Sequence, residues 1–145
     1  MKNFFTPKEV ARLIEISYRQ IQYWDKTHLI KPSYRRRGKY RLYNFIDLIQ
    51  LRIIKILRDH GSSIQRLRHT IESLKRLLRQ VNHPLVELTF LIEGDRILVF
   101  NREILMNEVS SRSYIRFEVR TLAEEINKVF PPIVAEDMRR RAAAG

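Results

Sequence analysis

The stretch that decides the fold spans residues 16–25 and reads Ile16-Ser17-Tyr18-Arg19-Gln20-Ile21-Gln22-Tyr23-Trp24-Asp25. It follows a short apolar helical pattern after a three-residue break, and Ile21 and Trp24 give it an apolar face of its own. Arg and Gln, on its other face, are the side chains best suited to paired hydrogen bonds with base edges in the major groove. Two helices joined by a tight turn, the second with such a face, form the helix-turn-helix plan. The sequence therefore predicts a DNA-reading helix over residues 18–27.

Both helix starts have a recognisable cap. Thr6-Pro7-Lys8-Glu9 has the spacing of a capping box with proline at the first helical position. Ser17 is a suitable N-cap for the second helix, because its hydroxyl can accept a free main-chain N–H. The two helices are therefore expected to begin at about residues 7 and 18.

A run of basic residues follows the second helix. Residues 31–41 contain six cationic side chains and no acidic one, with Gly38 in the middle as a turn residue. Two short segments that meet at a glycine indicate a β-hairpin. A basic hairpin after a helix-turn-helix is a wing, and a wing over residues 31–43 is expected to reach phosphates or the minor groove. The alternative is a solvated basic loop.

Two longer helices are expected next, over residues 45–59 and from residue 64 to about residue 81. The second of them repeats apolar residues at alternating steps of three and four, which is a short heptad pattern. The pattern fits either the core of this chain or a second subunit, and it is too short to establish a coiled coil.

The distribution of charge separates the chain into two halves. Its 145 residues have a net charge of +12; residues 1–80 hold 19 Lys/Arg against 6 Asp/Glu, and residues 81–145 hold 9 against 10. A basic half joined to a neutral half suggests that only the first half meets a polyanion. There is no cysteine, so disulfides and thiolate metal sites are excluded. No apolar run is long enough to span a bilayer, and we expect a cytoplasmic protein with no membrane contact.

The second half has a different pattern, expected to be β-β-β-α. Residues 85–92 are β-rich, residues 93–96 form a turn, and residues 97–100 return as the partner strand. Residues 114–119 alternate as a third strand. Thr121 and Glu124 then have capping-box spacing before an apolar helix stripe that ends near Phe130. So small a unit would be marginal alone, and pairing of two copies through residues 85–130 is expected. Ligand sensing is the alternative.

Taken together, the first half resembles the winged helix-turn-helix domain of MerR-type transcriptional regulators over residues of about 4–78. The motifs that carry the resemblance are Thr6-Pro7-Lys8-Glu9-Val10-Ala11, Ile16-Ser17, Gln22-Tyr23-Trp24-Asp25, Leu29-Ile30-Lys31-Pro32, Gly38-Lys39-Tyr40-Arg41-Leu42-Tyr43, Asp47-Leu48 and Ile53 through Ile64. An arginine is usual in this family where Gln22 stands, and a glycine is common where His28 stands. The end of the second helix is therefore expected to differ in shape.

The resemblance implies a set of DNA contacts. The expected base or phosphate contacts of the second helix are Tyr18, Arg19, Gln20, Gln22 and Tyr23. The expected wing contacts are Arg35, Arg36, Arg37, Lys39, Tyr40 and Arg41. The implied partners are double-stranded DNA, a second copy of the chain and, as a further candidate, RNA polymerase. The implied location is the nucleoid. No cofactor and no metal are expected.

The sequence thus predicts an α+β fold with a DNA-binding domain (1–81), a small β-rich dimerisation or effector domain (85–132) and a disordered tail (133–145). The four histidines fall in separate segments without metal-ligand spacing, and no nucleophile stands beside a base, so the chain is not expected to be an enzyme. The predicted function is a dimeric, sequence-specific transcription regulator. An architectural or DNA-segregation protein that uses the same winged helix is the alternative.

Overall fold

The computed structural model describes residues 1–36, 40–82, 84–94, 96–101 and 114–132. The tail predicted for residues 133–145 lies outside the described residues. In chain order the elements are α1 (Pro7–Ile14), α2 (Tyr18–Lys26), β1 (Tyr34–Arg36), β2 (Tyr40–Leu42), α3 (Phe45–Asp59), α4 (Ile64–Gln80), the 3-10 turn η1 (Leu85–Glu87), β3 (Thr89–Glu93), β4 (Arg96–Phe100), β5 (Ile115–Glu118) and α5 (Val119–Val129). The predicted α+β class is confirmed.

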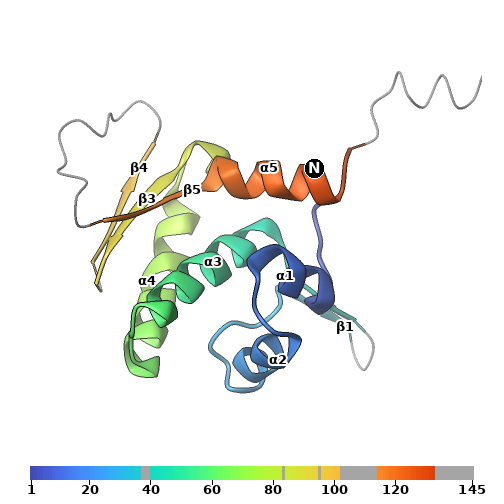
Figure 1. The fold of residues 1–145 in the computed structure, drawn as a ribbon, viewed down its shortest axis with the longest axis horizontal. Helices are drawn as coiled ribbons and strands as arrows, with labels where there is room; N and C mark the ends of the chain where they lie inside the picture. The colour runs from blue at the N-terminus through green and yellow to red at the C-terminus, as the bar shows by residue number, and fades with distance from the viewer. Residues whose placement is uncertain (37–39, 83, 95, 102–113, 133–145) are drawn as a thin grey trace, which may run out of the picture.

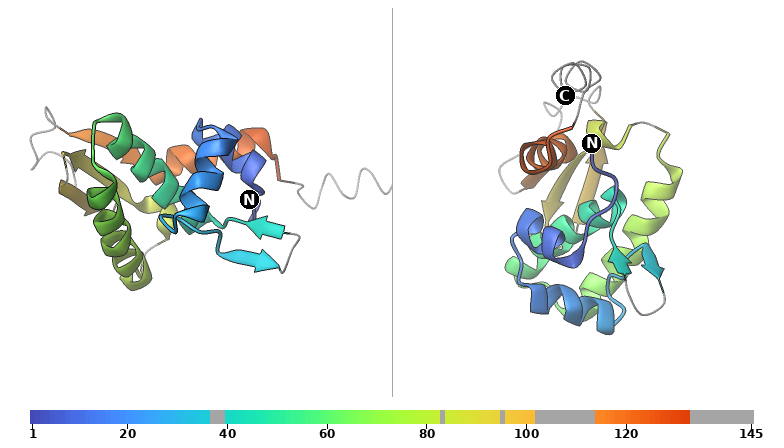
Figure 2. Two further views of the ribbon diagram at one scale, coloured as in Figure 1. Left: turned by 90° about the horizontal axis from the view of Figure 1, so that it is seen from below. Right: turned by 90° about the vertical axis from the view of Figure 1, so that its right-hand side faces the viewer.

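The elements are arranged around α3. Figure 1 shows α3 crossing the middle of the molecule, with α1 beside it, α2 and the β1-β2 hairpin lower down and α5 above it. The three-stranded sheet lies at one end of α5 and next to α4. Figure 2 shows the hairpin next to α2, so the two elements predicted to meet DNA lie at the same end of the molecule.

The predicted helix starts are confirmed at atomic level. The Glu9 main-chain N–H donates to Thr6 Oγ1 at 3.2 Å, and the Thr6 N–H donates to Glu9 Oε1 at 2.9 Å, which completes the capping box. The Gln20 N–H donates to Ser17 Oγ at 3.0 Å. These caps satisfy N–H groups that have no partner within the helix, and they fix where α1 and α2 begin.

The end of α2 differs from the expectation for His28. The Leu29 N–H donates to the Trp24 carbonyl at 2.9 Å and the His28 N–H donates to the Asp25 carbonyl at 3.1 Å, which together form a Schellman cap. His28 itself has φ = 62°, in the left-handed region that favours glycine. The histidine therefore leaves the shape of a glycine-type helix end unchanged, and strain in the backbone is its cost.

The second half forms the predicted three strands and one helix, with two corrections. The sheet order is β4-β3-β5 and both pairings are antiparallel. The first strand begins only at Thr89, because residues 85–87 form a 3-10 turn after Pro84. The predicted capping box at Thr121 is wrong, since α5 begins at Val119 directly after β5. Val119 is buried and its N–H donates to the Leu88 carbonyl at 3.1 Å, so the apolar stripe of α5 extends back to the strand.

The heptad pattern of α4 faces the core of this chain. Its buried members Leu67, Ile71, Leu74 and Leu78 belong to one apolar cluster that runs from Phe5 in the N-terminal segment to Ile126 in α5. Ile64, at the start of the pattern, is exposed. Since the cluster contains residues of both halves, α4 and α5 pack in a common core. The division into domains 1–81 and 85–132 stays a prediction.

Among the described residues, no helix is both long and apolar enough to cross a membrane.

Candidate nucleic-acid interface

The outer face of α2 is available to a partner. Tyr18 and Tyr23 are 41% and 54% exposed, Arg19 and Gln22 are also exposed, and Gln20 is half-buried. On the opposite face Ile21 and Trp24 are buried in the core. The five side chains predicted to read DNA therefore lie on or beside the solvent-facing surface of one helix.

Contacts from later parts of the chain hold α2 in place. The Arg58 guanidinium of α3 lies 5.5 Å from the centroid of the Trp24 ring, within cation–π distance. Arg68 Nη2 of α4 donates to the Thr27 carbonyl at 2.9 Å, at the C-terminal end of α2 where a positive charge is favoured. The orientation of α2 thus depends on α3 and α4.

The hairpin is a short antiparallel pair. Tyr34 faces Leu42, Arg35 faces Arg41, and Arg36 faces Tyr40 in its register. Arg35 Nη2 forms an ion pair with Asp25 Oδ1 of α2, and Arg41 Nε lies 3.5 Å from Asp25 Oδ2. Two of the predicted wing contacts are therefore joined to α2 through one carboxylate.

Of the four remaining predicted wing residues, two are described by their main chain alone. The main chain of Arg36 and Tyr40 lies in β1 and β2. Arg37 and Lys39 lie outside the described residues.

The base of the hairpin is fixed by Asp47 in the first turn of α3. Asp47 Oδ2 accepts the main-chain N–H of Ser33 at 3.0 Å and that of Asn44 at 2.9 Å, one from each end of the hairpin. The Asp47 N–H in turn donates to Asn44 Oδ1 at 2.9 Å, a capping box that the sequence analysis missed. Burial raises the pKa of the Asp47 carboxyl, against the opposing effect of its hydrogen bonds to Ser33 and Asn44.

Tyr43 joins the hairpin to the N-terminal segment. Phe5 and Tyr43 exchange two main-chain hydrogen bonds, of 2.9 Å and 2.8 Å. The Tyr43 ring is buried, and burial together with the nearby charges of Asp25 and Asp47 raises the pKa of its hydroxyl. This side chain is therefore a structural support of the hairpin and is closed to a solvent-side ligand.

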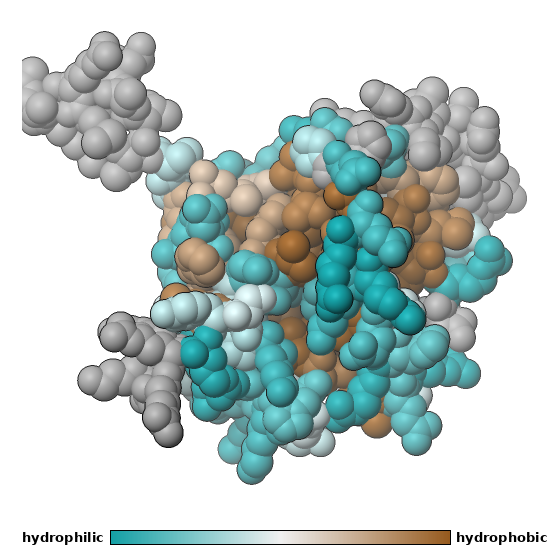
Figure 3. Space-filling model, turned by 180° about the vertical axis from the view of Figure 1, so that it is seen from behind, coloured by the Kyte–Doolittle hydropathy of each residue, from teal (hydrophilic) through white to brown (hydrophobic). Residues whose placement is uncertain are grey.

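A cleft of about 640 Å³ separates the C-terminal part of α2 from the hairpin. Its lining residues are Gln22, Asp25, Lys26, His28, Lys31, Arg35 and Arg41. Four cations face one carboxylate there, a composition that suits a phosphate-bearing ligand. In Figure 3, hydrophilic residues dominate the lower half of the molecule, the end at which α2 lies, and hydrophobic residues gather in the upper half.

The sequence analysis missed some residues of this cleft. Lys26 lies at the end of the predicted second helix and Lys31 in the predicted wing over residues 31–43, but neither was named as a DNA contact. Asp25 was read only as part of a motif. One signal for Asp25 was present in the sequence: it is an acidic residue shortly before the cations of residues 31–41, and closely spaced cations need a counter-ion.

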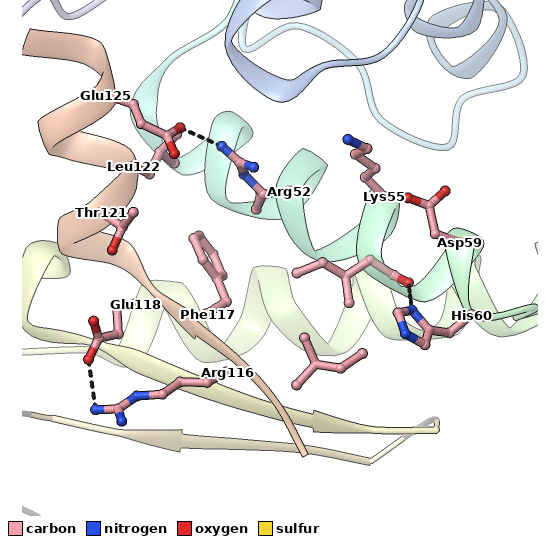
Figure 4. A pocket seen from close by; sticks show the side chains of 12 residues that line it. Arg52, Lys55, Asp59, His60, Arg116, Phe117, Glu118, Thr121, Leu122 and Glu125 are labelled. Atoms are coloured by element: carbon pink, nitrogen blue, oxygen red, sulfur yellow. Dashed lines mark hydrogen bonds and ion pairs between the residues drawn. The ribbon is translucent and has the colours of Figure 1, made fainter. Parts of the chain in front are cut away.

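A second cavity, of about 370 Å³, lies where α3 meets β5 and α5. Figure 4 shows Arg52 of α3 reaching Glu125 of α5; the ion pair measures 2.6 Å between Nη2 and Oε2. Arg52 Nη2 also lies 3.3 Å from the Leu13 carbonyl at the end of α1. The charged lining residues are three basic and three acidic ones, Arg52, Lys55, Arg116, Asp59, Glu118 and Glu125. The cavity therefore favours neither sign of ligand charge.

Within the part of the chain that the structure describes, no group of three His, Cys, Asp or Glu side chains could hold a metal ion.

A helix-turn-helix whose second helix is exposed beside a basic hairpin defines a DNA-binding class of protein. Residues 5–74 match the family model described as MerR HTH family regulatory protein, so this part of the chain is a MerR-type helix-turn-helix domain. The matched stretch lies within the resemblance noted over residues of about 4–78, and that resemblance is confirmed.

Curated relatives agree with this family. An uncharacterized HTH-type transcriptional regulator from Mycobacterium tuberculosis is 41% identical over 69 residues, which is 46% of this chain and 31% of that protein. The HTH-type transcriptional activator mta from Bacillus subtilis is 24% identical over 153 residues, 94% of this chain and 59% of that protein. The chain thus spans about a third and three fifths of the length of these two relatives. Both are named as regulators rather than enzymes, in agreement with the sequence-based prediction.

A solved structure of a MerR family transcriptional regulator from Bacillus cereus is 23% identical, covers 92% of this chain and 89% of its own, and has a TM-score of 0.45.

Proposed function

We propose that this chain is a sequence-specific, DNA-binding transcriptional regulator that acts as a dimer. The observation that carries the proposal is the exposed Tyr, Arg and Gln face of α2 beside a cleft with four cationic side chains. Polar side chains on a helix read base edges, whereas cations beside it contact the phosphates that fix its register. One surface of this protein offers both.

The proposed mechanism assigns different work to α2 and the hairpin. Arg19 and Gln22 enter the major groove and donate to base edges, while Tyr18, Gln20 and Tyr23 contact bases or the flanking backbone. The hairpin lies on the adjacent backbone or minor groove through Arg35, Arg36, Arg37, Lys39, Tyr40 and Arg41. Lys26 and Lys31 add phosphate contacts between the two.

A second copy is proposed to bind through residues 85–130. Among the described residues the strand order β4-β3-β5 leaves β4 and β5 as the outer strands, and outer strands are sites of pairing. Ile97 and Val99 pack on the core, so the alternating Leu98 and Phe100, which are half-buried, lie on the opposite sheet face beside the buried Leu91. The α4 heptad pattern is a weaker candidate because four of its apolar side chains, those of Leu67, Ile71, Leu74 and Leu78, are buried in their own chain.

The finer expectations on partners and location remain part of this proposal. A regulator of this kind works in the cytoplasm at the nucleoid, and RNA polymerase is the further partner that promoter binding would bring within reach. An architectural or segregation role with the same α2 and hairpin is the second candidate, but the names of the relatives favour regulation.

Selection from random-sequence duplexes followed by footprinting tests the proposal with the full chain. We expect a defined motif and a bounded footprint of one or two half-sites. A footprint that spreads along the duplex without a motif favours the architectural role, and failure to retain any duplex at low salt contradicts both.

A further inference from the structure

Arg35 and Arg41 stand directly opposite each other in the hairpin register. Side chains of directly opposed residues lie on the same face of an antiparallel pair, and like charges in that position repel. Both guanidinium groups turn toward Asp25 of α2, each to a different carboxylate oxygen. The single negative charge of Asp25 in α2 thus neutralises one of the two positive charges of the hairpin arginines.

Asp25, Arg35 and Arg41 form a trio whose side chains are buried to unequal extents. The Asp25 side chain is 5% exposed, whereas those of Arg35 and Arg41 are 49% and 43% exposed. The arginines can therefore change partner, but the carboxylate cannot leave. Because an unpaired carboxylate in a buried site is strongly disfavoured, at least one arginine has to remain with it.

We propose that Asp25 is an internal competitor for DNA phosphate, which holds back one of the two hairpin arginines and so limits the electrostatic strength of DNA binding. The inference rests on the proposed function, because it concerns the same cleft. The cleft beside the trio already presents Lys26 and Lys31, so an arriving phosphate meets the arginines where Asp25 holds them. Binding exchanges one Asp25–arginine pair for a phosphate–arginine pair, and the trio keeps its net charge of one throughout.

The salt dependence of binding measures this competition. The slope of log K against log salt counts the phosphates that protein cations neutralise, at about 0.9 for each on duplex DNA. Asp25→Asn should release the held arginine. For a short labelled duplex of arbitrary sequence, we expect the slope to steepen by about 0.9 and the affinity at about 0.1 M salt to rise roughly tenfold.

A matched control separates this effect from a general gain of positive charge. Glu124→Gln changes the net charge equally at an exposed position of α5, and we expect an unchanged slope. If folded Asp25→Asn protein binds with an equal or shallower slope than wild type, Asp25 instead positions the arginines for binding, and the proposal is overturned.

A second series leaves Asp25 intact and tests the same competition from the side of the arginines. With Asp25 holding one arginine, Arg35→Gln or Arg41→Gln alone should reduce the slope by about 0.9, and the double variant should reduce it by no more. Independent phosphate contacts would instead give a loss of about 1.8 in the double variant, which contradicts the competition. Wild-type protein that binds no duplex at all contradicts the proposed function itself, whereas binding with additive losses contradicts only the role of Asp25.

Discussion

The guanidinium of Arg68 donates a hydrogen bond of 2.9 Å to the main-chain oxygen of Thr27. The two residues are 41 positions apart, and the bond places a side chain of α4 on the C-terminal end of α2. The last carbonyls of a helix have no partner within it, so a cation from elsewhere satisfies one of them and its charge suits the helix dipole. A part of the fold that is far along the chain thus stabilises the helix proposed to read DNA.

Removing this contact should loosen α2. We expect Arg68→Ala to lower the free energy of unfolding by about 1 kcal/mol, the usual net value of such a hydrogen bond. Arg66→Ala, at an exposed position of the same helix, is the matched control and should change it by less than about 0.5 kcal/mol. Urea denaturation followed by circular dichroism compares the two, and equal effects would show that the bond to Thr27 contributes nothing.

Replacing His28 should stabilise the protein. Its φ of 62° costs an ordinary side chain about 1 kcal/mol, which glycine avoids. We therefore expect His28→Gly to raise the free energy of unfolding by about 1 kcal/mol. Lys26→Gly, two residues earlier and inside the helix, should lower it by about 1 kcal/mol. A destabilised His28→Gly protein would mean that the imidazole makes contacts worth more than the strain.

Asp47 should make stability depend on pH in a defined direction. Burial raises the pKa of its carboxyl in the folded state, so the folded protein holds this proton more tightly than the unfolded chain does. Its contribution is complete below the unfolded pKa of about 3.9 and is lost as pH rises through the higher folded value. The side chain of the variant Asp47→Asn does not titrate, so this variant lacks the pH-dependent contribution.

The difference in free energy of unfolding between wild type and Asp47→Asn should therefore fall as pH rises above about 4. Denaturation of both proteins across the acidic range measures it. A difference that grows with pH would indicate a lowered pKa and a carboxylate stabilised by its hydrogen bonds with Ser33 and Asn44.

Base reading and phosphate contact should separate by mutation. Arg19→Ala should cost about 1–3 kcal/mol at the selected site and relax the base preference at one position. Lys31→Ala in the cleft should weaken all sequences about equally and reduce the salt slope by about 0.9. Binding to a panel of single-base variants of the site distinguishes them, and identical specificity profiles would contradict the assignment.

The sheet face that carries Leu98 should be needed for pairing. We expect sedimentation equilibrium to show a dimer for the full chain and a shift toward monomer for Leu98→Lys, because a buried interface disfavours an unpaired ammonium group. Gln65→Lys, which adds the same charge on the exposed face of α4, should remain dimeric. A monomeric wild-type chain would remove the dimer from the proposed function.

The sequence predicted the first half closely because its signals are local. Thr6 with Glu9, and Ser17, mark helix starts within four residues, and the two short segments of the hairpin are close together in the sequence. The second half was harder, because its boundaries depend on distant contacts. Val119 continues the helix back to β5 because it is buried against a core that includes α3 and α4, whereas the local capping-box spacing at Thr121 pointed to a later start.

The same distinction applies to the candidate site. The exposed face of α2 follows from helical periodicity, and the structure places it as expected. The pairing of Asp25 with Arg35 and Arg41 could not be read from spacing, because it depends on how the hairpin packs against α2. The hydrogen bonds from Ser33 to Asp47 and from Arg68 to Thr27 likewise join residues that only the folded chain brings together.

Phe5 contacts two different parts of the protein. It exchanges two main-chain hydrogen bonds with Tyr43 at the foot of the hairpin, and its ring lies 6.1 Å from that of Phe130 at the end of α5. The angle at which the hairpin leaves the molecule is therefore set in part by residues outside the proposed DNA-contacting surface. Mutational surveys of α5 should consequently yield variants with altered operator preference whose DNA-facing surface is unchanged in composition.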